Sequence, residues 1–279
     1  MDILSALLFG IIQGLTEFLP VSSSAHLALC HAFFGLVPAE NYPGFDVMLH
    51  LGTLIAVFIA YRTDMPSVCK GYFTSLPKLF KNRFSLDKLE INERTAVFTV
   101  IVTVPAVIFA LLGGAELSDS IAAYPGYIGA LLIFNGVLLI ITDLIKTEKY
   151  TVCDVKYRHA LVTGLFEAVA ILPGISRSGA TVTAGRLCGI KRSDAVKLSF
   201  ISSVPAILGA AVLKAPDMIR ASLSFNSVLV YIAGGITAAV TGLCAIKLIK
   251  FISDRSKFRY FSYYCFALGA YAIYRTMKG

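Results

Sequence analysis

Residues 3–36 read ILSALLFGIIQGLTEFLPVSSSAHLALCHAFFGL, an apolar run with one break at Pro20-Val21-Ser22-Ser23-Ser24. A second apolar run, residues 159–190, breaks in a similar way at Pro173-Gly174-Ile175-Ser176. Each half of these runs has about ten to fifteen residues, too few to cross the hydrocarbon core of a bilayer. We therefore expect each run to form a helical hairpin that enters and leaves a membrane on the same side.

The two breaks are in register along the chain. Ser22 and Ser176 are 154 residues apart, and an amide or acid residue precedes each by nine positions, Gln13 in one case and Glu167 in the other. Polar residues inside apolar segments are costly in a bilayer and mark functional sites. Two matched breaks predict that the site lies where the hairpins meet.

The composition is that of a polytopic membrane protein. Of the 279 residues 57% are hydrophobic and 15% are charged, whereas a soluble domain has about a quarter charged residues. The net charge of +8 does not indicate nucleic-acid binding, because the basic residues lie between the apolar segments. The six cysteines are scattered without a C-x-x-C pair, so we expect neither a zinc site nor a disulfide framework.

Six further segments are long enough to span a bilayer as helices. They are residues 46–61, 95–113, 126–145, 197–213, 227–247 and 260–276. A hairpin followed by three spans occurs twice, in residues 1–145 and in residues 159–276. Because three is an odd number, the second unit should be inverted, which gives an all-α membrane domain with an inverted-topology repeat.

The basic residues orient this topology. Residues 62–94, 146–158, 186–197 and 247–259 hold 7, 4, 4 and 5 Lys or Arg, which is 20 of the 25 in the chain. The positive-inside rule places these four segments in the cytoplasm and the N-terminus outside. The first hairpin then opens to the extracytoplasmic side, and loop 62–94 is interpreted as a cytoplasmic loop.

The first break carries a set of reactive residue types. Gln13 and Glu17 share one helix face, and a lone carboxylate in an apolar run needs a partner or a cation. Ser22 or Ser23 is a natural N-cap for a helix that restarts after Pro20. His26, one turn into that helix, is a candidate acid or base or a structural histidine, whereas His31 and His50 are interpreted as structural.

The second break supplies positive charge. Ser176-Arg177-Ser178-Gly179 should begin a helix whose free N–H groups face those of the first, and Arg177 adds a fork suited to phosphate oxygens. The expected anion-binding residues are Arg177, Ser22, Ser24, Ser176, Ser178 and Gly179. The alternative for Arg177 is a buried pair with Glu17 or Glu167 and no ligand.

Serine, histidine, glutamate and arginine side chains at one anion-binding site indicate phosphoryl transfer. A cation on Glu17 would neutralise phosphate charge, and either Ser23 or a water activated near His26 would attack. Three consecutive serines leave the nucleophile undecided. The runner-up is a lipid transporter or flippase, because inverted repeats with broken helices are common in transporters.

Gln13-Gly14-Leu15-Thr16-Glu17-Phe18-Leu19-Pro20-Val21-Ser22-Ser23-Ser24-Ala25-His26 resembles the first signature of the bacterial undecaprenyl-diphosphatase, or bacitracin-resistance, family. Residues 172–181, LPGISRSGAT, resemble its second, and the match in length and segment order covers the chain. The resemblance implies a Mg²⁺- or Ca²⁺-dependent membrane hydrolase that converts undecaprenyl diphosphate to undecaprenyl phosphate on the extracytoplasmic side of the plasma membrane. Bacitracin would be connected with this protein only indirectly, through the lipid that both bind. The resemblance also implies a homodimer.

Carried over by motif, the resemblance makes Glu17 the metal carboxylate, Ser23 the nucleophile, His26 its base or a phosphate partner, and Arg177 the diphosphate clamp. Two positions are notable against the family pattern: the family has Glu or Gln where this chain carries the neutral Gln13, and often Gln where it carries Glu167. Our hypothesis is that the second metal carboxylate has moved across the pseudo-twofold axis, giving metal ligands Glu17, Gln13 and Glu167. A milder departure is Ala25, where the family usually has Gly.

Overall fold

The computed structural model describes residues 1–35, 44–79, 89–220, 225–253 and 257–278, and within them the chain is helical, with one isolated β-bridge between Tyr150 and Ile190. The α-helices are α1 (Ile3–Phe18), α2 (Ser23–Phe34), α3 (Phe45–Ala60), α4 (Met65–Leu79), α5 (Ile91–Phe109), α6 (Ala115–Ala122), α7 (Pro125–Leu144), α8 (Tyr157–Val169), α9 (Arg177–Leu187), α10 (Arg192–Arg220), α11 (Phe225–Ser253) and α12 (Arg259–Lys278). The expected all-α class is therefore confirmed.

Both predicted breaks separate short helices. α1 ends at Phe18, two residues before Pro20, and α2 begins at Ser23 after the N-cap Ser22, whose Oγ accepts a hydrogen bond from Ala25 N at 3.4 Å. α9 begins at Arg177 after the N-cap Ser176. The first residues of α2 and α9 are thus 154 positions apart, the spacing of the two sequence motifs.

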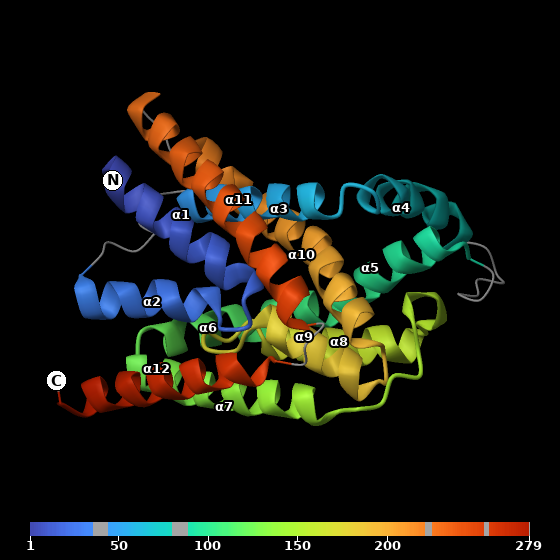
Figure 1. Cartoon of the computed structure of the whole chain (residues 1–279). Helices are drawn as coiled ribbons and strands as arrows, with labels where there is room; N and C mark the ends of the chain where they lie inside the picture. The colour runs from blue at the N-terminus through green and yellow to red at the C-terminus, as the bar shows by residue number, and fades with distance from the viewer. Residues whose placement is uncertain (36–43, 80–88, 221–224, 254–256, 279) are drawn as a thin grey trace.

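The tips of the two hairpins meet at the centre of the molecule. In Figure 1 α1 and α2 extend from this point toward the side of both termini, and α8 and α9 extend the opposite way. Gly174 N donates to Ser22 Oγ at 3.1 Å, and Ser178 Oγ donates to Phe18 O at 3.2 Å. Gly174 has a φ of +116°, which a side chain would strain, so the second break needs glycine here.

The six predicted spans all lie on helices, but within the described residues four stretches are both long and apolar enough to cross a membrane. They are Ile91–Ala122, Pro125–Leu144, Arg192–Val212 and Phe225–Ser253. A fifth is obtained if α3 and α4, which meet at 103°, count as one broken span. The sixth predicted span, α12, contains five tyrosines and Arg275, which lower its mean hydropathy.

Loop 62–94 is more structured than its polar composition predicts, because α4 occupies half of it. The rest of this loop includes residues 80–88, which lie outside the described residues. The same holds for Leu36 at the end of the first predicted hairpin and for residues 254–256 in the predicted loop 247–259.

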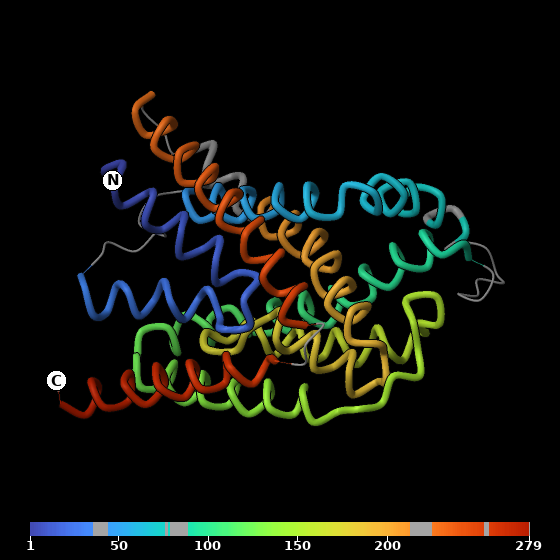
Figure 2. The backbone as a smooth tube through the Cα atoms, in the orientation of Figure 1, coloured from blue at the N-terminus to red at the C-terminus, as the bar shows by residue number. Residues whose placement is uncertain are grey.

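The helices pack in pairs across the two halves of the chain. α1 packs along α11, α8 along α5, and α7 along α12, where Figure 2 shows the two helices running side by side in opposite directions. A Cβ at Gly10 would lie 2.6 Å from Gly234 O, and one at Gly164 would lie 2.6 Å from Val102 O. These two glycines are again 154 positions apart, so equivalent residues permit equivalent close contacts.

Candidate functional site

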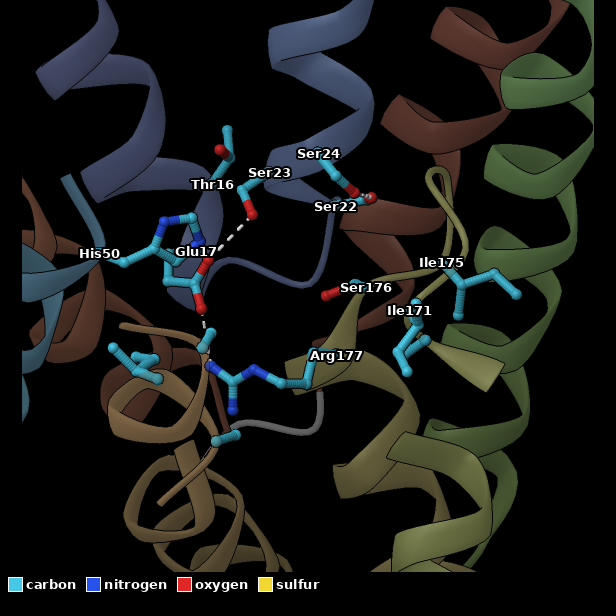
Figure 3. Close-up of a pocket in the computed structure, with 14 residues that line it drawn as sticks. Thr16, Glu17, Ser22, Ser23, Ser24, His50, Ile171, Ile175, Ser176 and Arg177 are labelled. Carbon is cyan, nitrogen blue, oxygen red and sulfur yellow. Dashed lines mark hydrogen bonds and ion pairs between the residues drawn. The ribbon is translucent and has the colours of Figure 1, made fainter. Parts of the chain in front are cut away.

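A cavity of about 300 Å³ lies where the two hairpin tips meet (Figure 3). Its polar lining consists of Thr16, Glu17, Ser22, Ser23, Ser24, His50, Ser176 and Arg177. Its apolar lining consists of Ala170, Ile171, Ile175, Ala206, Ile207 and Ala210. The lining of the cavity therefore combines hydrogen-bonding and charged groups with hydrocarbon side chains.

The carboxylate of Glu17 is the centre of the polar wall. Its Oε1 accepts a hydrogen bond from Arg177 Nη2 at 2.8 Å, and its Oε2 accepts from Ser23 Oγ at 2.9 Å and from Gln13 Nε2 at 3.1 Å (Figure 3). Glu17 is only 8% exposed. Three donors and an opposite charge compensate the loss of hydration that burial imposes on a carboxylate.

Arg177 is both paired and accessible. The ion pair with Glu17 at 2.8 Å is the arrangement that the sequence left open as an alternative to ligand binding. The guanidinium nevertheless lines the cavity, its side chain is 17% exposed, and its Nη1 makes only a long contact of 3.4 Å to Ser199 O. Pairing with Glu17 thus orients Arg177 without removing it from the cavity.

Ser22 joins the two breaks. Its φ of 71° is the one positive value at a non-glycine residue among the described parts of the chain. A residue outside glycine in this region stores strain of about 1–3 kcal/mol, which other contacts must offset. Here the offsetting contacts are the cap of α2 and the hydrogen bond from Gly174 N.

The serines that cap α2 and α9 make matching contacts. Ser22 Oγ lies 3.2 Å from Ser24 Oγ, and Ser176 Oγ lies 3.1 Å from Ser178 Oγ. Of the expected anion-binding residues, Ser22, Ser24, Ser176 and Arg177 line the cavity.

The other two expected anion-binding residues do not line the cavity. Ser178 Oγ is directed to Phe18 O, and Gly179 N donates to the capping Ser176 Oγ at 3.2 Å. Both contacts hold the hairpin tips together.

His26 does not lie against Ser23, contrary to the expectation from the sequence. Its Nδ1 is 2.7 Å from Ser22 O, and its Nε2 is 2.7 Å from the hydroxyl of Tyr264 on α12, against whose ring it stacks. His26 is also absent from the cavity lining. One turn of helix brings His26 close to the cap in sequence, but its side chain leaves α2 on the α12 side.

Two residues of the site were not singled out by the sequence. His50, interpreted there as structural, lines the cavity beside Glu17 (Figure 3). Asn135 on α7 bridges the two breaks, because its Nδ2 donates to Pro20 O at 2.9 Å and its Oδ1 accepts from Ser176 N at 3.0 Å. Both residues sit in plain apolar segments, and no motif around them gives a local signal.

The oxygen atoms expected to hold a cation are divided between two places. Gln13 Oε1 is buried without a hydrogen-bond partner next to Glu17, so a carbonyl donor and a carboxylate are available together. Both carboxylate oxygens of Glu167 are also buried without partners, but Glu167 makes no hydrogen bond to Glu17. Neither Gln13 nor Glu167 is among the residues that line the cavity. Within the described residues no three His, Cys, Asp or Glu side chains group around one point.

Fold and site together define a multi-pass helical membrane protein with a carboxylate, a guanidinium and several hydroxyls at a central cavity. Residues 6–271 match the family model described as bacitracin resistance protein BacA, and the chain belongs to this family.

Several relatives named undecaprenyl-diphosphatase match the chain over nearly its full length. That of Rubrobacter xylanophilus is 35% identical over 97% of both chains, and that of Alkaliphilus metalliredigens is 35% identical over 98% of both. That of Desulfatibacillum aliphaticivorans is 36% identical over 96% of both.

Proposed function

We propose that this protein hydrolyses undecaprenyl diphosphate to undecaprenyl phosphate and inorganic phosphate, which recycles a lipid carrier of cell-wall synthesis and gives bacitracin resistance. Membership of the family and the names of the relatives support this function. The single observation that carries it is the mixed lining of the cavity, which combines Arg177 and the N-terminal residues of α2 and α9 with six apolar side chains. Such a site fits a charged diphosphate head group that is joined to a hydrocarbon tail.

Binding of the diphosphate would use charge and backbone groups together. The first turns of α2 and α9 present unpaired N–H groups with the positive end of a helix dipole behind them. The guanidinium of Arg177 offers further donors with a fixed geometry for phosphate oxygens. When a phosphate takes over part of Arg177, the Glu17 carboxylate gains freedom to accept a proton.

Ser23 is the nucleophile that the geometry supports best. Its Oγ already donates to Glu17 Oε2 at 2.9 Å, so Glu17, rather than His26, is positioned to accept its proton. A bond would form between Oγ and the terminal phosphorus, and the bond from that phosphorus to the bridging oxygen would break. The bridging oxygen keeps the electron pair and leaves as undecaprenyl phosphate. Water would then attack the phosphorus on Ser23, the bond from phosphorus to Oγ would break, and Oγ would recover a proton, so that inorganic phosphate is released. Attack by a water that Ser23 and Glu17 orient is the alternative.

A Mg²⁺ or Ca²⁺ ion would be held by the Glu17 carboxylate and the Gln13 carbonyl oxygen, since hard cations prefer oxygen donors. When bound, it would neutralise phosphate charge and polarise the bond that breaks. The unpartnered Gln13 Oε1 supports this pair of ligands. Glu167 remains a further candidate ligand, with less support because, unlike Gln13, it makes no hydrogen bond to Glu17.

The architecture we infer is an inverted repeat, with residues 1–145 and 159–276 each forming one re-entrant hairpin and three spans. The matched pairs α1–α11 and α8–α5 support it. So does the contact of α7 with α12, where a Cβ at Gly129 would lie 2.6 Å from Gly269 O and one at Gly269 would lie 2.6 Å from Gly129 O. Reciprocal contacts of this kind arise at a twofold axis.

The cavity is inferred to open to the extracytoplasmic side of the bacterial plasma membrane, with bilayer lipid around the helices. The gathering of 20 of 25 basic residues in four segments supports this orientation. Bacitracin would act on this protein only by binding the shared lipid. A homodimer remains an expectation of family membership, and no nucleic-acid partner is proposed.

The proposed function is tested by measuring phosphate release from a long-chain polyprenyl diphosphate by the purified protein in detergent, with and without a chelator. Ser23→Ala and Arg177→Lys should each lower the rate by about 100-fold or more, and the chelator should abolish it. Glu116→Gln, an exchange of an acidic residue on α6 away from the cavity, should keep the rate of the unmodified protein. Absence of release by the unmodified protein, or release unaffected by Ser23→Ala and Arg177→Lys, would overturn the proposal. Movement of lipid across vesicles without release would favour the transporter instead.

A further inference from the structure

Asn135 is a fully buried amide in the middle of the apolar helix α7. A polar side chain at such a depth is costly in a membrane-spanning helix and marks a functional position by default. Asn135 is not among the residues that line the cavity, so its effect on a reaction there has to pass through other residues. The mechanism proposed above assigns it no role.

The amide of Asn135 satisfies one backbone group of each break. Its Nδ2 donates to Pro20 O at 2.9 Å, and its Oδ1 accepts from Ser176 N at 3.0 Å. A carbonyl oxygen only accepts and a backbone N–H only donates, so these two partners determine which end of the amide carries the oxygen. Nδ2 also lies 3.4 Å from Cys265 Sγ on α12. These contacts together hold the amide in one orientation.

The two backbone groups that Asn135 holds lie just before the reactive residues. Pro20 precedes Ser23 by three positions, and Ser176 is the N-cap of α9, next to Arg177. A cap residue sets the point and the direction at which its helix begins, so a fixed Ser176 also fixes the start of α9. Asn135 therefore links the backbone that carries the proposed nucleophile to the backbone that carries the proposed diphosphate clamp.

The direct hydrogen bonds between the two breaks are less rigid than this link. Both use a serine hydroxyl, that of Ser22 in one case and that of Ser178 in the other. A hydroxyl rotates to suit its partner, whereas the amide of Asn135 is planar and presents its donor and its acceptor at a fixed separation. Within the described residues Ser176 N makes no hydrogen bond other than the one to Asn135.

Glu17 also joins the reactive residues, but through their side chains. It accepts from Ser23 Oγ and from Arg177 Nη2, and these are the bonds that a bound diphosphate would replace. Asn135 bonds to backbone groups outside the cavity lining, so its link persists when the side chains turn toward a substrate.

We propose that Asn135 is a positioning residue that holds Ser23 and Arg177 at the separation needed for attack on the diphosphate. This inference rests on the proposed function. Attack by Ser23 Oγ requires alignment with the bond that breaks, and a displacement of about 1 Å can cost about 100-fold in rate. Binding of the diphosphate tolerates such a displacement better, because charges and helix N-termini act over longer distances. Loss of the amide should therefore lower kcat and leave binding nearly unchanged.

The test compares Asn135→Leu with Thr142→Val. Thr142 is also fully buried on α7, and its Oγ1 lies 2.6 Å from Thr183 Oγ1 on α9, so Thr142→Val removes a contact between the same two helices away from the breaks. Both variants should lower the melting temperature. Only Asn135→Leu should lower kcat for phosphate release from a polyprenyl diphosphate, by about 100-fold. The Kd of an analogue with a methylene group in place of the bridging oxygen should change by less than about threefold.

A double-mutant cycle with Arg177→Lys tests whether the two residues act through one arrangement. The doubly substituted protein should lose clearly less than the product of the two single losses. Asn135→Ser, whose hydroxyl is too short to reach both partners, takes the place of Asn135→Leu if the latter does not fold.

Four results would each overturn the inference. They are a kcat of Asn135→Leu within about threefold of normal, binding of the analogue that weakens as much as kcat falls, an equal loss of kcat in Thr142→Val, and single losses that multiply fully in the cycle. Failure of the proposed function is recognised separately, because the unmodified protein would then release no phosphate.

Discussion

At the scale of single residues, the site depends on side chains that each satisfy several partners. Glu17 accepts from three donors on α1, α2 and α9, and so ties the two hairpins together through one carboxylate. Ser22 caps α2 and also accepts from the second break. A substitution at Glu17 or Ser22 should therefore change both activity and stability, and a control variant is needed to separate the two effects.

The first residue-scale prediction concerns Glu17→Gln, which removes a charge while keeping shape. Arg177 would lose its buried partner and Ser23 its proton acceptor, so kcat for phosphate release should fall about 100-fold and thermal stability should drop. The control is Glu93→Gln, which breaks the Lys78–Glu93 pair between α4 and α5, away from the cavity. A Glu17→Gln rate within threefold of normal would contradict the assigned role.

A second prediction uses the backbone of Ser22. Ser22→Ala loses the cap and keeps an unfavourable φ of 71°, whereas Ser22→Gly loses the cap but relieves the strain. Ser22→Ala should therefore lower the melting temperature more than Ser22→Gly, with a difference of about 1–2 kcal/mol in unfolding free energy. Equal melting temperatures for the two variants would mean that the strain is absent in solution.

At the scale of helices, close backbone contacts position the breaks. Gly10 lets α1 approach α11, and Gly164 lets α8 approach α5, so each hairpin is held by a helix of the other half of the chain. Asn135 on α7 then hydrogen-bonds to both breaks at once. The location of the cavity thus follows from helix contacts outside the two motifs.

The helix-scale prediction is that Gly10→Ala and Gly164→Ala each destabilise the protein by about 1–3 kcal/mol, because the new Cβ meets a backbone carbonyl that cannot move alone. Gly209→Ala on α10 is the matched control, since a Cβ there has no atom within 4 Å. Gly209→Ala should be neutral or slightly stabilising, as alanine favours helix over glycine. Thermal unfolding in detergent measures all three, and equal melting temperatures would refute the packing argument.

At the scale of the whole molecule, the charge pattern and the opposed hairpins predict one orientation in the membrane. Figure 1 shows the α1–α2 and α8–α9 hairpins approaching the centre from opposite ends. The described elements next to three of the four predicted cytoplasmic segments, namely α4 and the starts of α8 and α10, lie at the end away from both termini, whereas α11 ends and α12 begins near the centre. This arrangement can be tested without knowledge of the reaction.

The whole-molecule prediction concerns labelling by a thiol reagent that cannot cross membranes, in variants that keep one cysteine each. Met277→Cys, near the C-terminus and 83% exposed, should react in intact spheroplasts. Cys153, which is exposed in the predicted cytoplasmic segment 146–158, should react only after the membrane is opened. The reverse pattern would invert the topology and place the cavity on the cytoplasmic side.

Much of the local structure was predictable because its causes are local. Pro20 ends α1, and Ser22 and Ser176 cap the helices that follow, so a few neighbouring residues define both breaks. The apolar segments likewise became helices, although α10 and α11 are longer than the predicted segments 197–213 and 227–247. The number of complete spans was not predictable in this way, because α3 and α4 meet at 103° and count as a span only when the two helices are taken together.

The sequence by itself determined the all-helical class, the two breaks with their 154-residue spacing, and the residue types Glu17, Ser23 and Arg177 at the site. Only the tertiary structure decided that Glu17 rather than His26 meets Ser23, that His50 enters the cavity, and that Asn135 joins the breaks. The physical reason is that helix ends depend on neighbouring residues along the chain. The direction in which a side chain points depends instead on how each helix is rotated against the others, and distant glycines and carbonyls set that rotation.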